Sequence, residues 1–187
     1  MRDTRGELLF EAEILIRGRG YSGFSYADLA SAVGIRKASI HHHFPTKTDL
    51  AMALIAAYGE RYDTALARIE AQSTLALARV EAYGDLYLDG VEQGLGCLCA
   101  VMAAELVSLP DPLRAAIAAF FAKHIAWLET TLQEGCANGS IRPSIDPAAH
   151  ARMIVATLEG ALMMERVLAG ASGFRSVLAA LRDGLAP

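Results

Sequence analysis

The sequence predicts an all-α protein of about nine helices, in which an N-terminal helix-turn-helix domain precedes a larger helical domain. Three observations support this fold class. The stretch from Ser25 to Asp49 has the pattern of two short helices joined by a glycine turn and closed by a proline. Apolar residues recur at helical spacing through the rest of the chain. No segment alternates as a half-buried β-strand does.

The first short helix is expected to begin near Tyr26. Ser25 and Asp28 resemble a capping box, in which the serine hydroxyl accepts from a backbone N–H of the first turn and the acid complements the helix dipole. Gly34 supplies the left-handed backbone that ends the helix. The face predicted to be buried carries Leu29, Ala30 and Val33.

The second short helix is expected from about Arg36 to His43, where Pro45 stops it. Its predicted buried contacts are Ile35, Ile40 and Phe44. The other face is polar and carries Arg36, Lys37, Ala38, Ser39, His41 and His42. Thr46 and Asp49 repeat the capping pattern for the helix that follows.

The polar face of this second helix suits DNA. Residues 34–48 include no carboxylate, so phosphates approach without like-charge repulsion. Ser39 and the imidazoles can donate or accept at base edges, and Ala38 leaves room for a thymine methyl. The alternative is a helical hairpin whose polar face is merely solvated. The fixed cations of the segment are Arg36, Lys37 and Lys47.

Three stretches between Glu7 and Leu54 carry a family resemblance. They are a first helix with Leu9, Ala12, Ile14 and Leu15, then Gly20-Tyr21, then the Ser25 to Asp49 block with its Phe-Pro-Thr-Lys run. In these stretches the chain resembles the TetR-type transcriptional regulators. The resemblance implies that Arg36 to His42 form the recognition helix, that Lys47 holds a phosphate, and that Ser25 contacts the DNA backbone.

The sequence departs from that family pattern at His41 and His43, where such proteins usually have tyrosine. A base contact by His41 would therefore depend on pH. The histidine triplet predicts no metal site, because adjacent side chains on a helix point about 100° apart and cannot converge on one ion. No cofactor is expected. The predicted DNA-binding residues are Ser25, Arg36, Lys37, Ala38, Ser39, His41, His42 and Lys47.

Charge is unevenly divided along the 187 residues, whose net charge is −4. Residues 1–50 hold seven Lys or Arg against six Asp or Glu, and the remainder holds ten against fifteen. An acidic body behind a locally basic face repels DNA everywhere except at that face. We expect a DNA-binding domain over residues 1–46 and an effector-binding and dimerisation domain over residues 47–187.

Other classes of protein find little support in the sequence. No run of about 20 apolar residues lacks charge, and the acidic N-terminus is not a signal peptide, so we expect a soluble, cytoplasmic protein without membrane contact. Three cysteines do not make the disulfide framework of a secreted protein. No nucleophile elbow, phosphate loop, metal-ligand spacing or carboxylate pair indicates an enzyme.

Start and stop signals divide the residues after Lys47 into helices. A long connecting helix is expected from Lys47 to about residue 69, and Ser73 can cap the next one. Asp111-Pro112 and Asp146-Pro147 are start signals, and Asn138-Gly139 is a stop. Later helices are expected near residues 95–108, 111–137, 147–169 and 172–185.

The last two helices offer more apolar surface than one small helical body needs to bury. Two such helices from each of two copies would make the four-helix interface that this family commonly forms, and would set two recognition helices one DNA turn apart. The alternative is that the same surface closes an intramolecular core. The apolar residues are Ala156, Leu158, Gly160, Ala161, Leu162, Met163, Met164, Val177, Leu178, Ala180 and Leu181.

Large or soft side chains on several helices predict an apolar effector cavity in the body, with ordinary core packing as the alternative for each of them. Glu105, Glu159 and His124 are its candidate polar contacts. The predicted effector-binding residues are Tyr83, Tyr87, Cys97, Met102, Glu105, Phe120, His124, Trp127, Met153, Glu159 and Met163, and Phe121 belongs to the same apolar set.

Cys97 has a second interpretation. The segment Gly96-Cys97-Leu98, followed by Met102 and Glu105, resembles a TetR subgroup that includes the repressor of N-ethylmaleimide reductase, in which a cysteine at this place senses electrophiles. A helix N-terminus favours a thiolate, so such chemistry is reasonable. The alternative is a buried small hydrophobe.

Residues and resemblance together predict a dimeric repressor that a small-molecule effector releases from its operator. The effector would pull the long helix after Lys47 and change the spacing of the two reading heads. Two alternatives stay open. One is a redox- or electrophile-sensing repressor that uses Cys97, and the other is a helical adaptor that binds protein without DNA.

Overall fold

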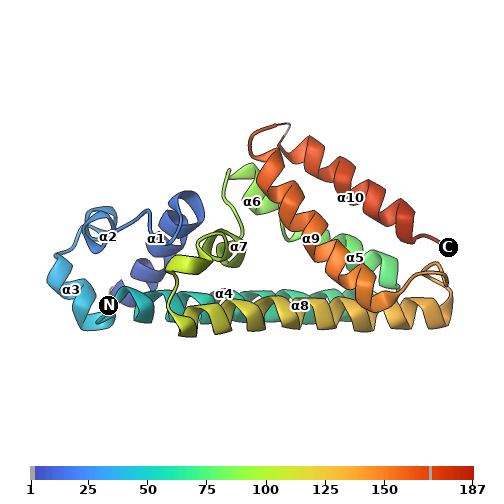
Figure 1. Cartoon of the computed structure of the whole chain (residues 1–187), viewed down its shortest axis with the longest axis horizontal. Coiled ribbons are helices and arrows are strands. Elements are labelled where there is room, and N and C mark those ends of the chain that lie inside the picture. The colour runs from blue at the N-terminus through green and yellow to red at the C-terminus, as the bar shows by residue number, and fades with distance from the viewer. Residues whose placement is uncertain (1–2, 169) are drawn as a thin grey trace. The chain divides into compact units, whose positions relative to one another are not determined.

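The computed structural model describes residues 3–168 and 170–187. In that part of the chain it contains ten α-helices, one 3₁₀ helix and no β-strand, which confirms the all-α fold class (Figure 1). None of the described helices is long and apolar enough to cross a membrane. The helices are α1 (Thr4–Arg19), α2 (Tyr26–Val33), α3 (Lys37–His43), α4 (Lys47–Gln72), α5 (Ala76–Asp85), α6 (Leu88–Glu92), α7 (Leu98–Ala103), η1 (Leu106–Ser108), α8 (Asp111–Asn138), α9 (Pro147–Glu165) and α10 (Ala171–Leu185).

Packing divides the described residues into two compact units. The first, which we call the head, combines Met1–Arg61 with Gly96–Ala119, and the second, the body, combines Tyr62–Leu95 with Phe120–Pro187. Helices α4 and α8 contribute to both units. Helix α7 and η1 therefore belong with the reading helices, although they lie far along the chain. The boundary expected between residues 46 and 47 is a functional one and stays a prediction.

Local signals shape the helix-turn-helix as predicted. The Ser25 hydroxyl accepts from the N–H of Asp28 at 3.3 Å, and the Asp28 carboxylate accepts from the N–H of Ser25 at 2.7 Å, so the capping box is confirmed. Gly34 ends α2 with a φ of +73°. Thr46 and Asp49 form the same reciprocal pair at the start of α4, at 2.9 and 3.1 Å.

Helix α3 is held on the head by apolar side chains and by one hydroxyl. Ile40 and Phe44 are buried, as predicted. The Tyr26 hydroxyl lies 2.9 and 2.6 Å from the carbonyl oxygens of Phe44 and Thr46, which share its one hydrogen, and so fixes the turn between α3 and α4. Burial raises the pKa of Tyr26 to about 12, so the hydroxyl stays protonated and able to donate.

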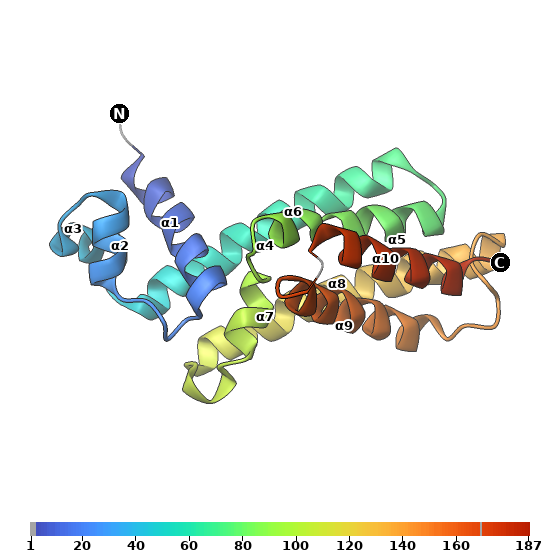
Figure 2. The same ribbon diagram turned by 90° about the horizontal axis from the view of Figure 1, so that it is seen from above.

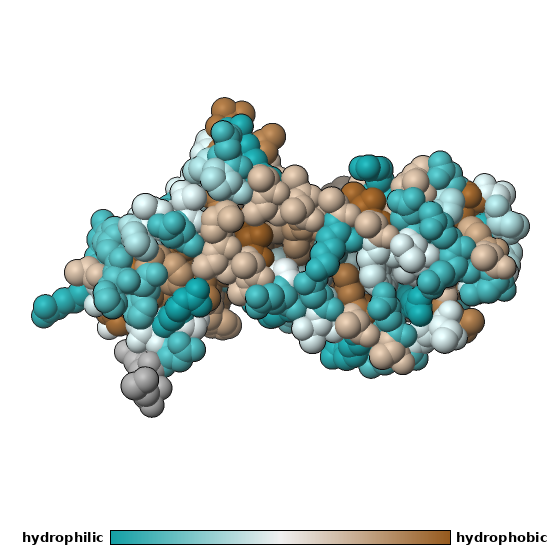
Figure 3. All heavy atoms as spheres, turned by 90° about the horizontal axis from the view of Figure 1, so that it is seen from below, coloured by the Kyte–Doolittle hydropathy of each residue, from teal (hydrophilic) through white to brown (hydrophobic). Residues whose placement is uncertain are grey.

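The single helix expected over residues 95–108 is divided in the structure. Helix α7 is short, and the chain leaves helical geometry at Glu105 before η1. The Glu105 carboxylate accepts from the N–H of Ser22 at 2.8 Å, which ties this segment to the turn between α1 and α2. The short helix η1 is apolar and exposed, and the Val107 residue is 94% exposed to solvent. This segment forms the brown projection at the upper edge of Figure 3.

In the body, α10 packs against α9, α5 and α6, and lies beside α9 and α5 in Figures 1 and 2. Asp146 caps α9 by accepting from Ala148 N–H at 3.0 Å, as the Asp-Pro signal predicts. Helix α9 ends at Glu165, before the predicted residue 169, because residues 166–168 form a turn. Residue 169 itself lies outside the described residues. The sequence also missed α6 as a separate helix.

The close approach of Ala76 and Ile141 to Gly135 allows the packing of the body to be tested by substitution. This glycine is buried in α8, and a Cβ there would overlap Ala76 and Ile141, so Gly135→Ala is expected to lower the free energy of unfolding by about 1–3 kcal/mol. Gly59 lies in α4 with open space around it, so Gly59→Ala should raise that free energy by about 0.5–1 kcal/mol. Urea denaturation of both variants measures the difference. Equal stabilisation by the two alanines would contradict this packing.

Candidate nucleic-acid interface and effector site

The outer face of α3 presents its polar residues to solvent. Arg36, Lys37, Ala38 and Ser39 are exposed, and so are His41 and His42. In the described part of the chain, no carboxylate lies within ion-pair distance of Arg36 or Lys37. The nearest acids in sequence, Asp28 and Asp49, are engaged in caps. The structure thus brings the predicted reading residues together on one uncompensated cationic face.

The structure defines the contacts of the His41 ring, which the sequence alone did not. Its Nδ1 lies 3.1 Å from the carbonyl oxygen of Pro45, which can only accept, so Nδ1 carries the hydrogen and donates. Its ring meets the ring of Tyr26 edge-on, with 4.9 Å between centroids. Nε2 is therefore the ring nitrogen that this contact leaves available.

Two predicted DNA-binding residues have structural partners within the head. The Ser25 hydroxyl donates to Asp28 at 2.6 Å and accepts from the first turn of α2. The Lys47 ammonium donates to the carbonyl oxygen of Phe24 and lies 4.2 Å from the centre of the Phe24 ring. Burial lowers the pKa of Lys47. The contact of Lys47 with a DNA phosphate stays a prediction. The observed hydrogen bond to Phe24 ties the start of α4 to the turn between α1 and α2.

The predicted effector-binding residues divide between the two units. Met102 and Cys97 are buried in the head, and Glu105 is bonded to Ser22 there. Met153 and Met163 belong to the body but not to its interior, because each is 45% exposed on α9. The other predicted residues gather in the body, where Tyr83, Tyr87, Phe120 and His124 are buried and Trp127 and Glu159 are half-buried.

Four of these interior side chains form a polar chain. The Tyr83 hydroxyl lies 3.1 Å from His124 Nδ1 and 3.2 Å from the Tyr87 hydroxyl, which donates to Glu159 at 3.4 Å. Tyr83 and His124 are 0% and 2% exposed. Burial lowers the pKa of His124 to about 4, so the imidazole is neutral near pH 7. Aromatic rings surround it, from Tyr62, Tyr83 and Phe120.

One arrangement of hydrogens satisfies all three contacts. In this arrangement Tyr87 donates to Glu159 and Tyr83 donates to Tyr87. Tyr83 then accepts from His124, whose Nδ1 carries the imidazole hydrogen. His124 Nε2 is then an acceptor.

Cys97 occupies the N-cap position of α7, near a helix start as expected, but its thiol makes no capping hydrogen bond. Its side chain is only 3% exposed, so a dissolved electrophile reaches the sulfur only if α7 moves. Cys99 is fully buried, and the described residues contain no disulfide. These facts fit a buried small hydrophobe better than an exposed sensor thiol.

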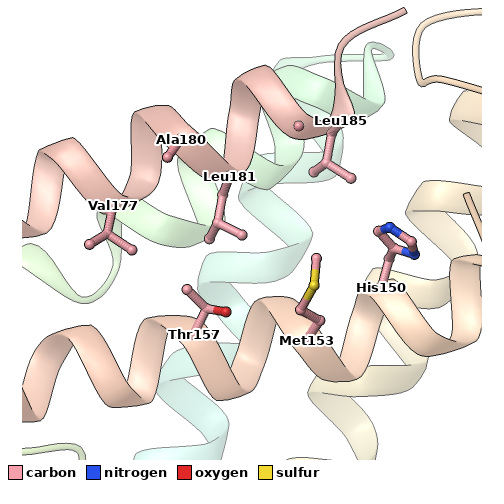
Figure 4. Close-up of a pocket in the computed structure, with 8 residues that line it drawn as sticks. His150, Met153, Thr157, Val177, Ala180, Leu181 and Leu185 are labelled. Atoms are coloured by element: carbon pink, nitrogen blue, oxygen red, sulfur yellow. The ribbon is translucent and has the colours of Figure 1, made fainter.

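Helices α9 and α10 enclose a shallow apolar groove of about 290 Å³ on the surface of the body. Figure 4 shows Val177, Leu181 and Leu185 of α10 on one side, with Thr157 and Met153 of α9 on the other. His150 stands at one end. The remaining lining residues, Ala180 and Gly184, are small, so another helix can approach closely.

The fold and the reading face define a helix-turn-helix DNA-binding regulator. Residues 8–54 match the family model of bacterial regulatory proteins, tetR family, and residues 76–181 match the tetracyclin repressor-like C-terminal domain. The chain belongs to the TetR family of transcriptional regulators. It is thus a regulator and not an enzyme, as the sequence predicted.

Individual relatives agree with this assignment. The chain is 30% identical to the transcriptional regulator AcuR of Cereibacter sphaeroides over 80% of its length and 70% of that protein. It is 26% identical to the transcriptional repressor NemR of Escherichia coli K12, over 98% of its own length and 94% of that protein. A TetR-family regulator from Agrobacterium tumefaciens superposes with a TM-score of 0.93 at 31% identity, covering 98% and 97% of the chains. The reduced form of E. coli NemR superposes with a TM-score of 0.86 at 25% sequence identity, and the match covers 99% of this chain and 98% of that one.

Sequence reasoning missed several residues that the structure places at the reading face. Thr4 and His43 line a hollow of about 510 Å³ beside α3, together with Ile35, Ala38, Ser39 and His42. Arg5 lies over the ring of Phe44. No local signal identifies these contacts, because they join the start of α1 to a helix much later in the chain.

The buried His124 predicts an acid-sensitive body. Its pKa falls from 6.5 to about 4 on folding, so the unfolded chain binds the extra proton between these values. The free energy of unfolding should therefore fall by about 2 kcal/mol from about pH 7 to about pH 5 through this residue. Urea denaturation at both pH values measures it. The His124→Phe variant should not show this fall in the free energy of unfolding, whereas a variant at the exposed His42, His42→Asn, should still show it. Equal falls in the two variants would show that His124 is not the group responsible.

Proposed function

We propose that this regulator is a dimeric repressor that reads its operator with α3 and leaves it when a small molecule binds the body. The observation that carries the proposal is the exposed face of α3, where two arginine or lysine side chains stand without a neighbouring carboxylate. Release of the operator by an effector is typical of the family. A cytoplasmic location follows from this function.

We infer that Arg36 and Lys37 bind phosphates while Ser39, His41 and His42 face the base edges. Guanidinium and ammonium groups supply sequence-independent affinity through counterion release. Hydroxyl and imidazole groups supply donors and acceptors at the floor of a major groove. Ala38 keeps the centre of the face low enough for the helix to enter.

The dimer interface that we propose is the groove between α9 and α10. Family members typically dimerise. The groove is apolar and lined partly by small residues, and Met163 and Met164 continue its apolar surface along α9. Burying such a surface against a second copy would remove it from water and form a four-helix interface. The dimer would present two α3 helices to successive major grooves.

The effector site that we propose is the polar chain around His124. Its aromatic surroundings favour an apolar or aromatic molecule, and His124 Nε2 favours one that carries a hydrogen-bond donor. Binding there would favour one arrangement of the two heads over another, with α4 as one of the elements that carry the change.

The reading face is tested by an Arg36→Ala, Lys37→Ala double variant. Fluorescence anisotropy with a labelled duplex, repeated over a series of NaCl concentrations, should show weaker binding and a salt slope reduced by about 0.9 for each phosphate that is no longer bound. Arg68→Ala removes an exposed charge from the body part of α4 and serves as control. Undiminished affinity of the double variant would remove α3 from the mechanism.

The interface is tested by Leu181→Glu, which places a carboxylate in the α9–α10 groove. The variant should sediment as a monomer of 19.9 kDa and the unaltered protein at twice that mass, because an unpaired buried charge costs several kcal/mol. Val107→Glu, at an exposed apolar site in the head, should leave the dimer intact. A dimeric Leu181→Glu protein would show that the interface lies elsewhere.

A further inference from the structure

We propose that the first turn of α1 is a second DNA-backbone contact, in which the Arg5 guanidinium binds a phosphate beside the groove that α3 enters and the Thr4 hydroxyl donates to the same strand. The proposal rests on the DNA-reading function of α3 and extends it to a part of the chain outside the helix-turn-helix. The occupant is duplex DNA.

The hollow beside α3 is the first observation. Thr4 shares its walls with Ala38, Ser39 and His42, which belong to the proposed reading face. The hollow is therefore continuous with that face and not a separate site. With a volume of about 510 Å³, it leaves room for a sugar-phosphate strand to pass between α3 and the start of α1.

The position of Arg5 is the second observation. The guanidinium carbon lies 5.3 Å from the centre of the Phe44 ring, and that ring is itself buried against the head. A cation held over an aromatic face is attracted to it and loses less freedom on binding than a mobile one. The side chain remains exposed, so its N–H groups are available to solvent and to a phosphate.

The charges around Arg5 are the third observation. Within the described residues no carboxylate lies within ion-pair distance of Arg5. Asp3, two residues earlier, turns its carboxylate to its own helix and accepts from the N–H of Gly6 at 3.0 Å. Arg5 is thus a fixed cation with no protein counterion, and phosphate is the partner that its planar fork fits.

Salt dependence tests the contact without knowledge of the operator, because phosphate contacts are independent of sequence. The probe is a labelled mixed-sequence duplex of about 30 base pairs, long enough for two heads one DNA turn apart. The slope of log Kd against log NaCl concentration should decrease by about 0.9 for each phosphate that Arg5→Ala no longer binds, or about 1.8 for a dimer. Arg5→Lys keeps the charge and should retain most of the slope.

Thr4→Val separates the neutral contact from the charged one. It keeps the shape of the side chain and removes its donor, so binding should weaken by about 3- to 10-fold with the slope unchanged. Arg68→Ala removes an arginine from the body and should alter neither quantity. Thermal unfolding of each variant shows whether the fold is retained.

The outcomes distinguish this inference from the proposed function. If the unaltered protein binds the duplex, the Arg36→Ala, Lys37→Ala variant loses binding, and Arg5→Ala keeps the full slope, then α3 reads DNA and the α1 contact does not exist. If neither set of variants changes the slope, the proposed reading function itself fails. A reduced slope in Arg5→Ala and in Arg68→Ala alike would indicate a general charge effect and overturn the α1 contact.

Discussion

The bond from the Tyr26 hydroxyl to the turn after α3 is the interaction on which the reading face depends. It fixes the carbonyl oxygens of Phe44 and Thr46 in the buried side of the head, and the Tyr26 ring receives the edge of His41. Phe44, held by the same turn, carries Arg5. One phenol in α2 thus contacts both the turn that ends α3 and the ring of His41, and Phe44 in that turn lies under the Arg5 guanidinium.

The two units handle polar groups in opposite ways. The head leaves its arginine and lysine side chains on α3 in water, where phosphates can replace the solvent. In the body, by contrast, the side chains of Glu159, Tyr87, Tyr83 and His124 form a chain of contacts with one another, and Tyr83 and His124 are almost fully buried. The burial of His124 keeps its imidazole neutral near pH 7, because it lowers the pKa of that group to about 4.

The sequence predicted what local chemistry decides. The Ser25–Asp28 box, the left-handed Gly34 and the Asp146-Pro147 start all act within a few residues, and each appears in the structure where the sequence places it. Long-range contacts decided the rest. Glu105 pairs with Ser22, far away in sequence, and the expected helix is divided beside it. Met153 and Met163 share the composition of core residues, but the rotation of α9 turns them outward. No periodicity argument reveals which face of an apolar helix finds a partner.

The chain passes between the body and the head three times, at residues 61–62, 95–96 and 119–120. The long helix after Lys47, to which the sequence assigned the coupling of the two units, contains only the first of these points. At the second of these points the Arg17 guanidinium donates to the Gly96 carbonyl oxygen at 2.7 Å, and Arg17 is also paired with Glu13. Glu13 in turn pairs with Arg61 of α4 at 2.6 Å. The last residues of α1 therefore link two of the three passages, so a displacement of either one acts on the same helix.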